Sequence, residues 1–161
     1  MRQLKSKFVS VGVCAACAFG GIAMGIAWAT PSAGVTTTVL AGPVTFDDIK
    51  AMSLVPDEHL AMIMTKGESD VYMVHNKIAP GGQTGWHSHP GISFVTIRSG
   101  TATAYEGGDP NTPHVLAAGT GFVEQAGHTH NIRNEGTTDL ELIAFQLIPA
   151  GATRRVDAPA P

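Results

Sequence analysis

The chain has 161 residues, which is enough for one domain with a substantial core and hardly enough for two. Its 19 glycines and 10 prolines, with only 14% charged residues, favour short strands and tight turns over long helices. The formal net charge of −3, without a cluster of Lys and Arg, argues against nucleic acid as a partner.

Residues 1–29 have the pattern of a signal peptide. Basic residues precede an uncharged run over residues 8–29, and Ala27-Trp28-Ala29 has small residues where a signal peptidase reads. We therefore predict cleavage before Thr30 and a periplasmic or secreted protein. The run also reaches the roughly 20 residues that cross a bilayer, so the alternative is an inner-membrane anchor over residues 8–29. Both cysteines lie in this leader, so the mature chain would have no disulfide and no thiolate ligand.

Residues 30–57 are expected to form an N-terminal arm and a short helix. Residues 30–43 are small and polar, which is typical of a flexible arm. Thr45 is a suitable N-cap, and Asp47 and Asp48 place acids in the first helical turn. Pro56 follows soon after, so the helix should be brief.

Residues 58–150 contain short strand-like runs that are separated by glycine, proline and asparagine turn signals. The runs cover residues 71–78, 92–98, 101–105, 121–124, 128–133 and 140–148. Without a helical pattern among them, they predict an all-β sandwich or barrel that forms a single domain. The run over 140–148 is apolar on both faces apart from Glu141 and Gln146, as expected of an interior strand. Residues 151–161 are predicted to be a flexible tail.

Three histidines indicate a metal site. His87 and His89 are two residues apart, and residues i and i+2 of a strand point to the same face. A neighbouring strand can bring in His130. Neutral imidazole is a common ligand of zinc, copper, iron and nickel, so we predict that these residues bind a metal inside the barrel. The alternative is three ordinary polar residues near a barrel mouth.

The chain around these histidines resembles the cupin superfamily. Eight residues fit the spacing of the two cupin motifs, namely Gly81, His87, His89, Gly100, Gly119, Gly127, His130 and Asn134. The resemblance covers residues 71–149. It implies a cupin double-stranded β-helix, the jelly-roll barrel, with one divalent metal ion in its mouth. Within the superfamily the chain is similar to small single-domain cupins with an export leader.

The chain departs from the cupin pattern at one expected ligand. In the first motif, a glutamate follows the second histidine after three or four residues. In this chain these two spacings lead to Ser93 and Phe94, and neither has a carboxylate. Gln125 also replaces the proline of the second motif, which affects a turn more than the chemistry. The resemblance then implies three neutral imidazole ligands and two or three open positions on the ion. Such a ligand set discriminates poorly among Fe, Mn, Cu, Zn and Ni.

Four further residues are candidates for lining the pocket or for supporting the ligands. His128 alternates onto the face of His130, and we expect it to line the pocket, with ligation as the alternative. Glu124 can supply the missing carboxylate from a neighbouring strand, or else it is a solvated acid before a turn. Strand alternation places the Ser93 side chain on the same inward face as His89. Gln146 either orients a ligand or faces solvent.

A three-histidine metal site suits a small anionic, chelating molecule or dioxygen chemistry on iron. The resemblance to thiol and diketone dioxygenases implies a metal-dependent oxygenase or an isomerase/lyase. The sequence contains no evident general base, which leaves open a non-catalytic binder of a small ligand or metal. An uncleaved leader would instead suit a membrane-anchored interaction module. A homodimer is also open, because Met52, Met62, Met64 and Met73 can be core filler or dimer contacts.

Overall fold

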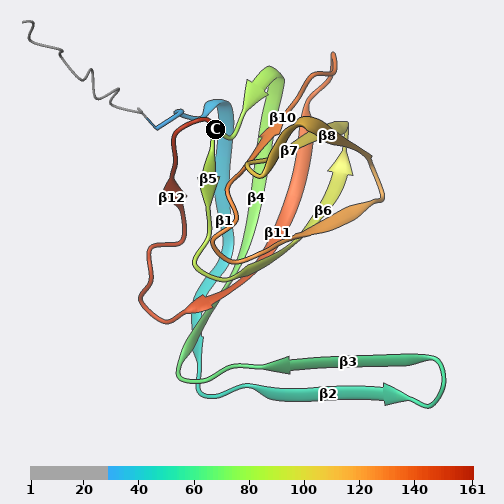
Figure 1. The fold of residues 1–161 in the computed structure, drawn as a ribbon, viewed down its shortest axis with the longest axis vertical. Coiled ribbons are helices and arrows are strands. Elements are labelled where there is room, and N and C mark those ends of the chain that lie inside the picture. Colours follow the sequence, from blue (N-terminus) through green and yellow to red (C-terminus); the bar gives the residue numbers. More distant parts are fainter. Residues whose placement is uncertain (1–28) are drawn as a thin grey trace, which may run out of the picture.

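The computed structural model describes residues 29–161, and every regular element in this part is a β-strand (Figure 1). The strands are β1 (Ala33–Phe46), β2 (Lys50–Val55), β3 (His59–Met64), β4 (Ser69–Gln83), β5 (His87–Ser88), β6 (Ile92–Ser99), β7 (Thr101–Glu106), β8 (Asp109–Ala117), β9 (Gly121–Glu124), β10 (His130–Arg133), β11 (Leu140–Pro149) and β12 (Val156–Asp157). Ten strands form one nearly closed antiparallel sheet, and β2 and β3 form a separate hairpin. The all-β fold that the turn pattern predicts is confirmed, and so is the jelly-roll barrel that the resemblance implies.

The core lies inside this curved sheet, where side chains alternate between the interior and the surface. Strand β11 pairs with β4 on one side and with β6 on the other, which confirms that it is an interior strand. Val74, Val95, Ile97 and Leu142 are at most 3% exposed and belong to one cluster. Each large aliphatic side chain buried in this way stabilises the fold by roughly 1.5–3 kcal/mol. The packed interior therefore gives the barrel mouth rigid walls.

The N-terminal segment differs from expectation, because residues 33–46 form strand β1 instead of an arm. Strand β1 runs antiparallel to β4. Its Val- and Thr-rich sequence contains many β-branched side chains, which favour a strand. The predicted helix at Thr45 is wrong: the Thr45 hydroxyl donates to Asp70 Oδ1 at 2.7 Å, and Asp48 Oδ1 accepts from the Gly67 amide at 2.6 Å. Both capping groups are thus used by long-range partners.

The hairpin of β2 and β3 projects away from the barrel (Figure 1). Its large apolar side chains are exposed along both strands, with Met52 at 67%, Leu54 at 61%, Leu60 at 62% and Met62 at 58%. Exposure of this extent rules out the interpretation of these methionines as core filler within one chain. An isolated two-stranded hairpin is only marginally stable in water, so its apolar surface needs a cover.

The C-terminal segment, predicted to be a flexible tail, crosses the barrel mouth. Strand β12 pairs with β5, with Val156 opposite Ser88 and Asp157 opposite His87. The Ala158 amide donates to Trp86 O at 2.9 Å. Main-chain hydrogen bonds of this kind fix the segment beside the histidines, which the composition of the tail does not reveal.

The described residues contain no helix long and apolar enough to cross a membrane. The predicted signal peptide lies outside the described part of the chain, except for its last residue.

Candidate metal centre

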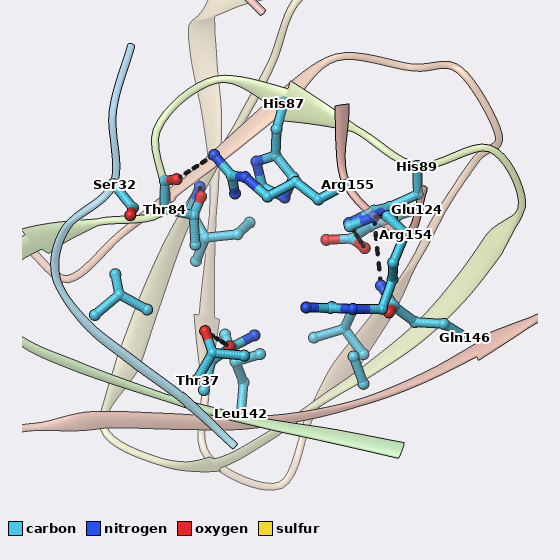
Figure 2. A pocket seen from close by; sticks show the side chains of 15 residues that line it. Ser32, Thr37, Thr84, His87, His89, Glu124, Leu142, Gln146, Arg154 and Arg155 are labelled. Carbon is cyan, nitrogen blue, oxygen red and sulfur yellow. Dashed lines mark hydrogen bonds and ion pairs between the residues drawn. The ribbon is translucent and has the colours of Figure 1, made fainter. Parts of the chain in front are cut away.

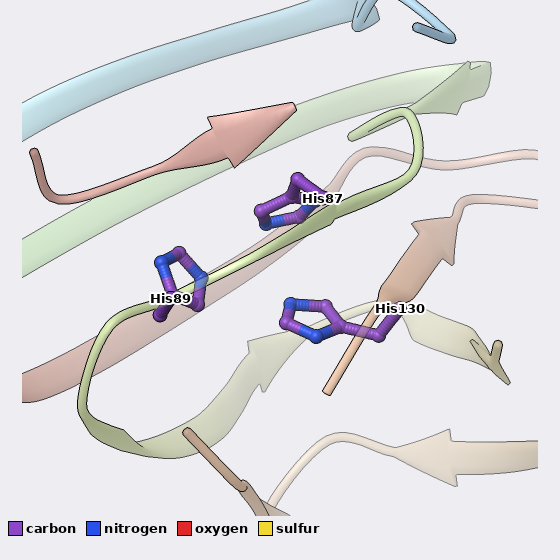
Figure 3. Close-up of side chains that lie close together, drawn as sticks. All are labelled: His87, His89 and His130. Carbon is purple, nitrogen blue, oxygen red and sulfur yellow. The ribbon is translucent and has the colours of Figure 1, made fainter. Parts of the chain in front are cut away.

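The three histidines of the two motifs meet at one point of the barrel mouth (Figure 3). His87 lies on β5, His89 directly follows that strand, and His130 begins β10, where it pairs with His87. One ligand nitrogen from each ring lies within 4.8 Å of the others. The side chains are only 2–5% exposed. The alternation along β5 and the pairing of β10 therefore bring together residues that are distant in the sequence.

Main-chain carbonyl groups fix the orientation of all three rings. The Nδ1 atom of His87 donates to Gly85 O at 2.8 Å, that of His89 to Arg154 O at 2.6 Å, and that of His130 to His128 O at 3.0 Å. A carbonyl oxygen can only accept, so each Nδ1 carries the proton. The Nε2 lone pairs are then free to bind a cation, which is the usual arrangement of metal-binding histidines.

The turn that holds His87 requires a glycine. Gly85 has a φ of 71°, a left-handed conformation that other residues rarely adopt. A Cβ atom at this position would also collide with the Thr30 carbonyl oxygen. Gly85 can therefore direct its own carbonyl oxygen at His87 Nδ1 while the chain near Thr30 passes closely above it.

The Glu124 carboxylate lies against the histidine cluster. Its Oε1 is 3.1 Å from His130 Nε2, and its Oε2 is 3.4 Å from His89 Nε2. Glu124 is only 8% exposed, and His130 Nε2 makes no hydrogen bond of acceptable geometry. In the neutral tautomers, Nε2 lone pairs would thus face carboxylate oxygens in a buried site. That arrangement requires a positive charge between them, either a proton or a metal ion.

Cross-strand pairing explains how Glu124 reaches this position. Strand β9 pairs with β6 so that Glu124 lies directly opposite Ser93. Ser93 is the residue that replaces the motif glutamate, and it is fully buried. Directly opposite residues of an antiparallel pair have Cβ atoms about 4.5–5.5 Å apart. A carboxylate from β9 can therefore occupy nearly the same space as one from β6.

Burial and charge shift the pKa values of the cluster in opposite directions. Burial lowers the pKa of His87 to about 2, with help from the positive charges of His130 and Arg155. Burial also lowers the pKa of His89. For His130, burial favours the neutral ring, but the neighbouring Glu124 outweighs this effect and raises the pKa. Burial alone would raise the pKa of Glu124, yet His130 and His89 hold it below the ordinary value. In the metal-free cluster, the His87 ring is therefore neutral, and His130 and Glu124 favour each other's charged forms.

A small cavity of about 120 Å³ opens beside the cluster (Figure 2). Apolar side chains, including Val95, Leu142 and Ala144, form part of its wall. Gln146 is 2% exposed, points inward and donates from Nε2 to Ser93 Oγ at 3.2 Å. The cavity therefore admits only a small molecule, and polar side chains such as Thr37 and Asn76 line it together with the apolar ones.

The other residues singled out by the sequence fall into two groups. Ser93, Glu124 and Gln146 are buried around the cluster. The His128 side chain is exposed and does not line the cavity. It lies in the turn before β10, where strand alternation does not apply, and only its carbonyl group supports His130.

Sequence reasoning missed Arg154 and Arg155, which both line the cavity. The only signal was two adjacent arginines in a segment otherwise rich in Ala and Pro.

The donor set fits a divalent metal ion. Three buried histidines converge beside a buried carboxylate, and their Nδ1 protons are already used by the main chain, which leaves the Nε2 atoms for an ion. His130 Nε2 is a buried polar atom that lacks a hydrogen-bond partner, which fits the role of a metal ligand. Imidazole and carboxylate ligands are compatible with several first-row metals, so the donor set does not select one of them.

Known proteins provide independent information on the fold. Residues 74–146 match the family model described as a cupin domain. A polyketide cyclase from Streptomyces resistomycificus is 12% identical, with a TM-score of 0.55 over 80% of this chain and 75% of that one. A structure described as a predicted oxalate decarboxylase from Thermotoga maritima is 26% identical, with a TM-score of 0.43 over 52% of this chain and 83% of that one. A conserved protein of unknown function from Streptococcus pyogenes is 24% identical, with a TM-score of 0.45 over 51% and 68% of the two chains.

No curated protein matches the chain. The family match spans both histidine motifs and most of the barrel strands, from β4 to β11. The jelly-roll arrangement of those strands agrees with this match, so residues 74–146 are similar to a cupin domain.

Proposed function

We propose that this protein binds one divalent metal ion through His87, His89 and His130 and uses it to hold a small anionic ligand in the barrel mouth. One observation carries the proposal. All three Nδ1 atoms donate to main-chain carbonyls, so three Nε2 lone pairs converge in a buried site beside a carboxylate. A single proton on His130 can satisfy only one of these nitrogens, whereas a metal ion can satisfy all of them.

Glu124 is proposed as the fourth protein ligand. Its oxygens are 3.1 Å and 3.4 Å from two of the Nε2 atoms, so a small movement can place them around a shared ion. A carboxylate also reduces the net charge of the occupied site. The site then takes up a ligand of lower charge more readily than a site with three neutral imidazoles alone.

When bound, a divalent ion supplies Lewis acidity, which polarises a coordinated oxygen of the ligand. The residues of the chain supply the rest. Gln146 and Ser93 present polar groups beside His89, and Val95 and Leu142 contribute apolar contacts to the same cavity. If the protein is an enzyme, an oxygenase or an isomerase/lyase acting on a chelating acid suits this arrangement.

A second candidate is a non-catalytic binder of the same small ligand. Glu124 is the only carboxylate among the described residues that line the cavity, and it faces two histidines. No separate acid is therefore positioned for proton transfer to a ligand. Oxygen uptake in the presence of chelating acids detects an oxygenase, and product analysis of the same mixtures detects an isomerase or lyase, whereas a binder consumes no oxygen and leaves the acid unchanged.

Export is proposed from the leader pattern of residues 1–29 alone. An exported chain that folds outside the cytoplasm takes its metal there, so copper and zinc are as suitable as iron. Mass analysis of the protein isolated from cells tests this proposal. A chain that begins at Thr30 supports cleavage, and a chain that begins at Met1 supports a membrane anchor.

Elemental analysis tests the metal site. The purified protein is loaded with iron, copper or zinc, passed over a desalting column, and compared with a His87→Ala/His130→Ala variant. His75→Ala is the matched control, because His75 also lies 3.1 Å from a carboxylate, that of Glu141, outside the cluster. We expect about one ion per chain in the wild type and the control, and almost none in the double variant. Absence of metal after all three loadings would refute the proposal.

A further inference from the structure

We infer that Arg154 is the anion-binding residue of the cavity, and that the ligand is a small carboxylate with a second anionic group. This inference rests on the proposed metal site: one end of the ligand binds the metal ion and the other binds the Arg154 guanidinium group. Arg154 comes from the C-terminal segment that crosses the barrel mouth, a part of the chain outside both histidine motifs.

The side chain of Arg154 enters the cavity without an anionic partner. Figure 2 shows its guanidinium group beside Gln146 and directed into the space between the cavity walls. Within residues 29–161 its one side-chain hydrogen bond goes to a neutral group, from Nη1 to Gln146 Oε1 at 3.1 Å, and it forms no ion pair. The residue is half-buried, and burial lowers the pKa of its guanidinium group. A charge in this position is costly until an anion pairs with it.

The neighbouring Arg155 provides an internal comparison. Its Nε donates to Asp157 Oδ1 at 2.6 Å, and its Nη2 donates to Thr84 O at 2.8 Å. The charge of Arg155 is thus balanced by a carboxylate, and its side chain ties the C-terminal segment to the barrel. Of the two arginines, only Arg154 is left with a full charge for a ligand.

Arg154 is also coupled directly to the histidine cluster. Its carbonyl oxygen accepts the Nδ1 proton of His89 at 2.6 Å. Gln146, the partner of its guanidinium group, lies 3.4 Å from the same ring. The guanidinium group and the proposed metal ligand are therefore separated by one side chain. A small anion can reach both.

The shape and charge of the cavity define the class of ligand. A guanidinium group binds a carboxylate through two parallel hydrogen bonds, which a neutral carbonyl compound cannot match. The cavity of about 120 Å³ limits the ligand to a few heavy atoms. Short dicarboxylates meet these requirements. Neutral diketones and thiols do not, because they leave Arg154 without a counter-charge.

Binding of malonate to the Co(II)-loaded protein tests the inference. Visible absorption of Co(II) reports whether the metal site forms, and malonate is then titrated into wild type, Arg154→Gln, Arg154→Lys and Arg98→Gln. Arg98 is a matched control, because its side chain is 63% exposed and pairs with Glu141. Acetate is titrated in parallel, because its single carboxylate cannot bridge the metal ion and Arg154.

We expect Arg154→Gln to weaken malonate binding by about 10- to 100-fold and acetate binding by no more than about twofold. Arg154→Lys should fall between Arg154→Gln and wild type, and Arg98→Gln should match wild type. Unchanged malonate affinity in Arg154→Gln, with Co(II) bound, would overturn this inference and leave the proposed metal site intact. If wild type binds no Co(II), both this inference and the proposed metal site are wrong. If Arg154→Gln loses Co(II) while the other variants keep it, the malonate affinity of Arg154→Lys is the test. An affinity equal to that of wild type would then overturn the inference.

Discussion

Metal binding at acidic pH should release fewer protons than three ordinary histidines would. At pH 5.5 a histidine with the ordinary pKa of 6.5 is about 90% protonated, so three of them would release about 2.7 protons to one ion. In this protein, burial lowers the pKa of His87 to about 2, so that ring has no proton to release. The raised pKa of His130 leaves it with about 0.9 to 1 proton at this pH.

His89 sets the range of the expected value. Burial lowers its pKa, so it carries at most about 0.9 proton at pH 5.5. The pKa of Glu124 lies below its ordinary value of 4.5, so it releases almost none. Wild type should therefore release between about 0.9 and 1.9 protons per ion. The lower limit applies if His89 is fully neutral before the metal binds.

Substitution of Glu124 tests the origin of the bound proton. In Glu124→Gln the charge that raises the pKa of His130 is gone, and burial then favours the neutral ring. Release should fall below the wild-type value, by up to about one proton per ion from His130. Glu141→Gln is the matched control, because Glu141 contacts His75 at the same 3.1 Å distance outside the site.

Calorimetric titration with zinc in buffers of different ionisation enthalpy measures the protons released. The slope of the apparent binding enthalpy against buffer ionisation enthalpy is their number per ion. A wild-type value near 2.7 would refute the pKa assignments, as would an unchanged value in Glu124→Gln.

Three further predictions address stability, the position of the carboxylate and the apolar hairpin. Because the folded pKa of His87 is depressed, its contribution to stability is present above pH 6.5 and is lost as the pH falls. Urea unfolding of the metal-free protein should show a loss of about 2 kcal/mol from this residue at pH 5, and His87→Gln should flatten the profile. Exchange of the paired residues in Ser93→Glu/Glu124→Ser should retain zinc affinity within about tenfold, whereas Glu124→Ser alone should lose more. Equal affinities of the two variants would contradict this. Light scattering should detect a dimer, because a second copy of the chain can cover the exposed hairpin. The Leu54→Ser/Met62→Ser variant should be a monomer. A monomeric wild type would exclude a dimer formed through the hairpin.

The histidine cluster could be predicted because it depends only on local rules. Alternation along a strand places His87 and His89 on one face, and motif spacing selects His130 over His128. Both rules apply within a few residues of the side chains concerned. The barrel class could be predicted for the same reason, since turn signals and short apolar runs repeat along the chain.

The features that could not be predicted depend on pairings between distant segments. The formation of β1 by residues 33–46 depends on pairing with the edge of β4 that β11 does not occupy. The approach of Arg154 depends on the pairing of β12 with β5. The small and polar residues of both segments do not reveal a partner strand that lies far away in the sequence, and the β-branched side chains of residues 33–46 show only that this segment is compatible with one.

Glu124 lies between these two cases and shows how a motif can be incomplete while its site remains complete. A spacing motif records only residues of one strand, whereas a binding site is filled by whichever strands surround it. Strand β9 is adjacent to β6, so a carboxylate at Glu124 reaches the space that a glutamate at position 93 would fill. The absence of a motif residue therefore gives information on one strand only and not on the whole site. The acids on paired strands must be examined before a site is described as lacking a carboxylate, and here the register of β6 and β9 supplies it.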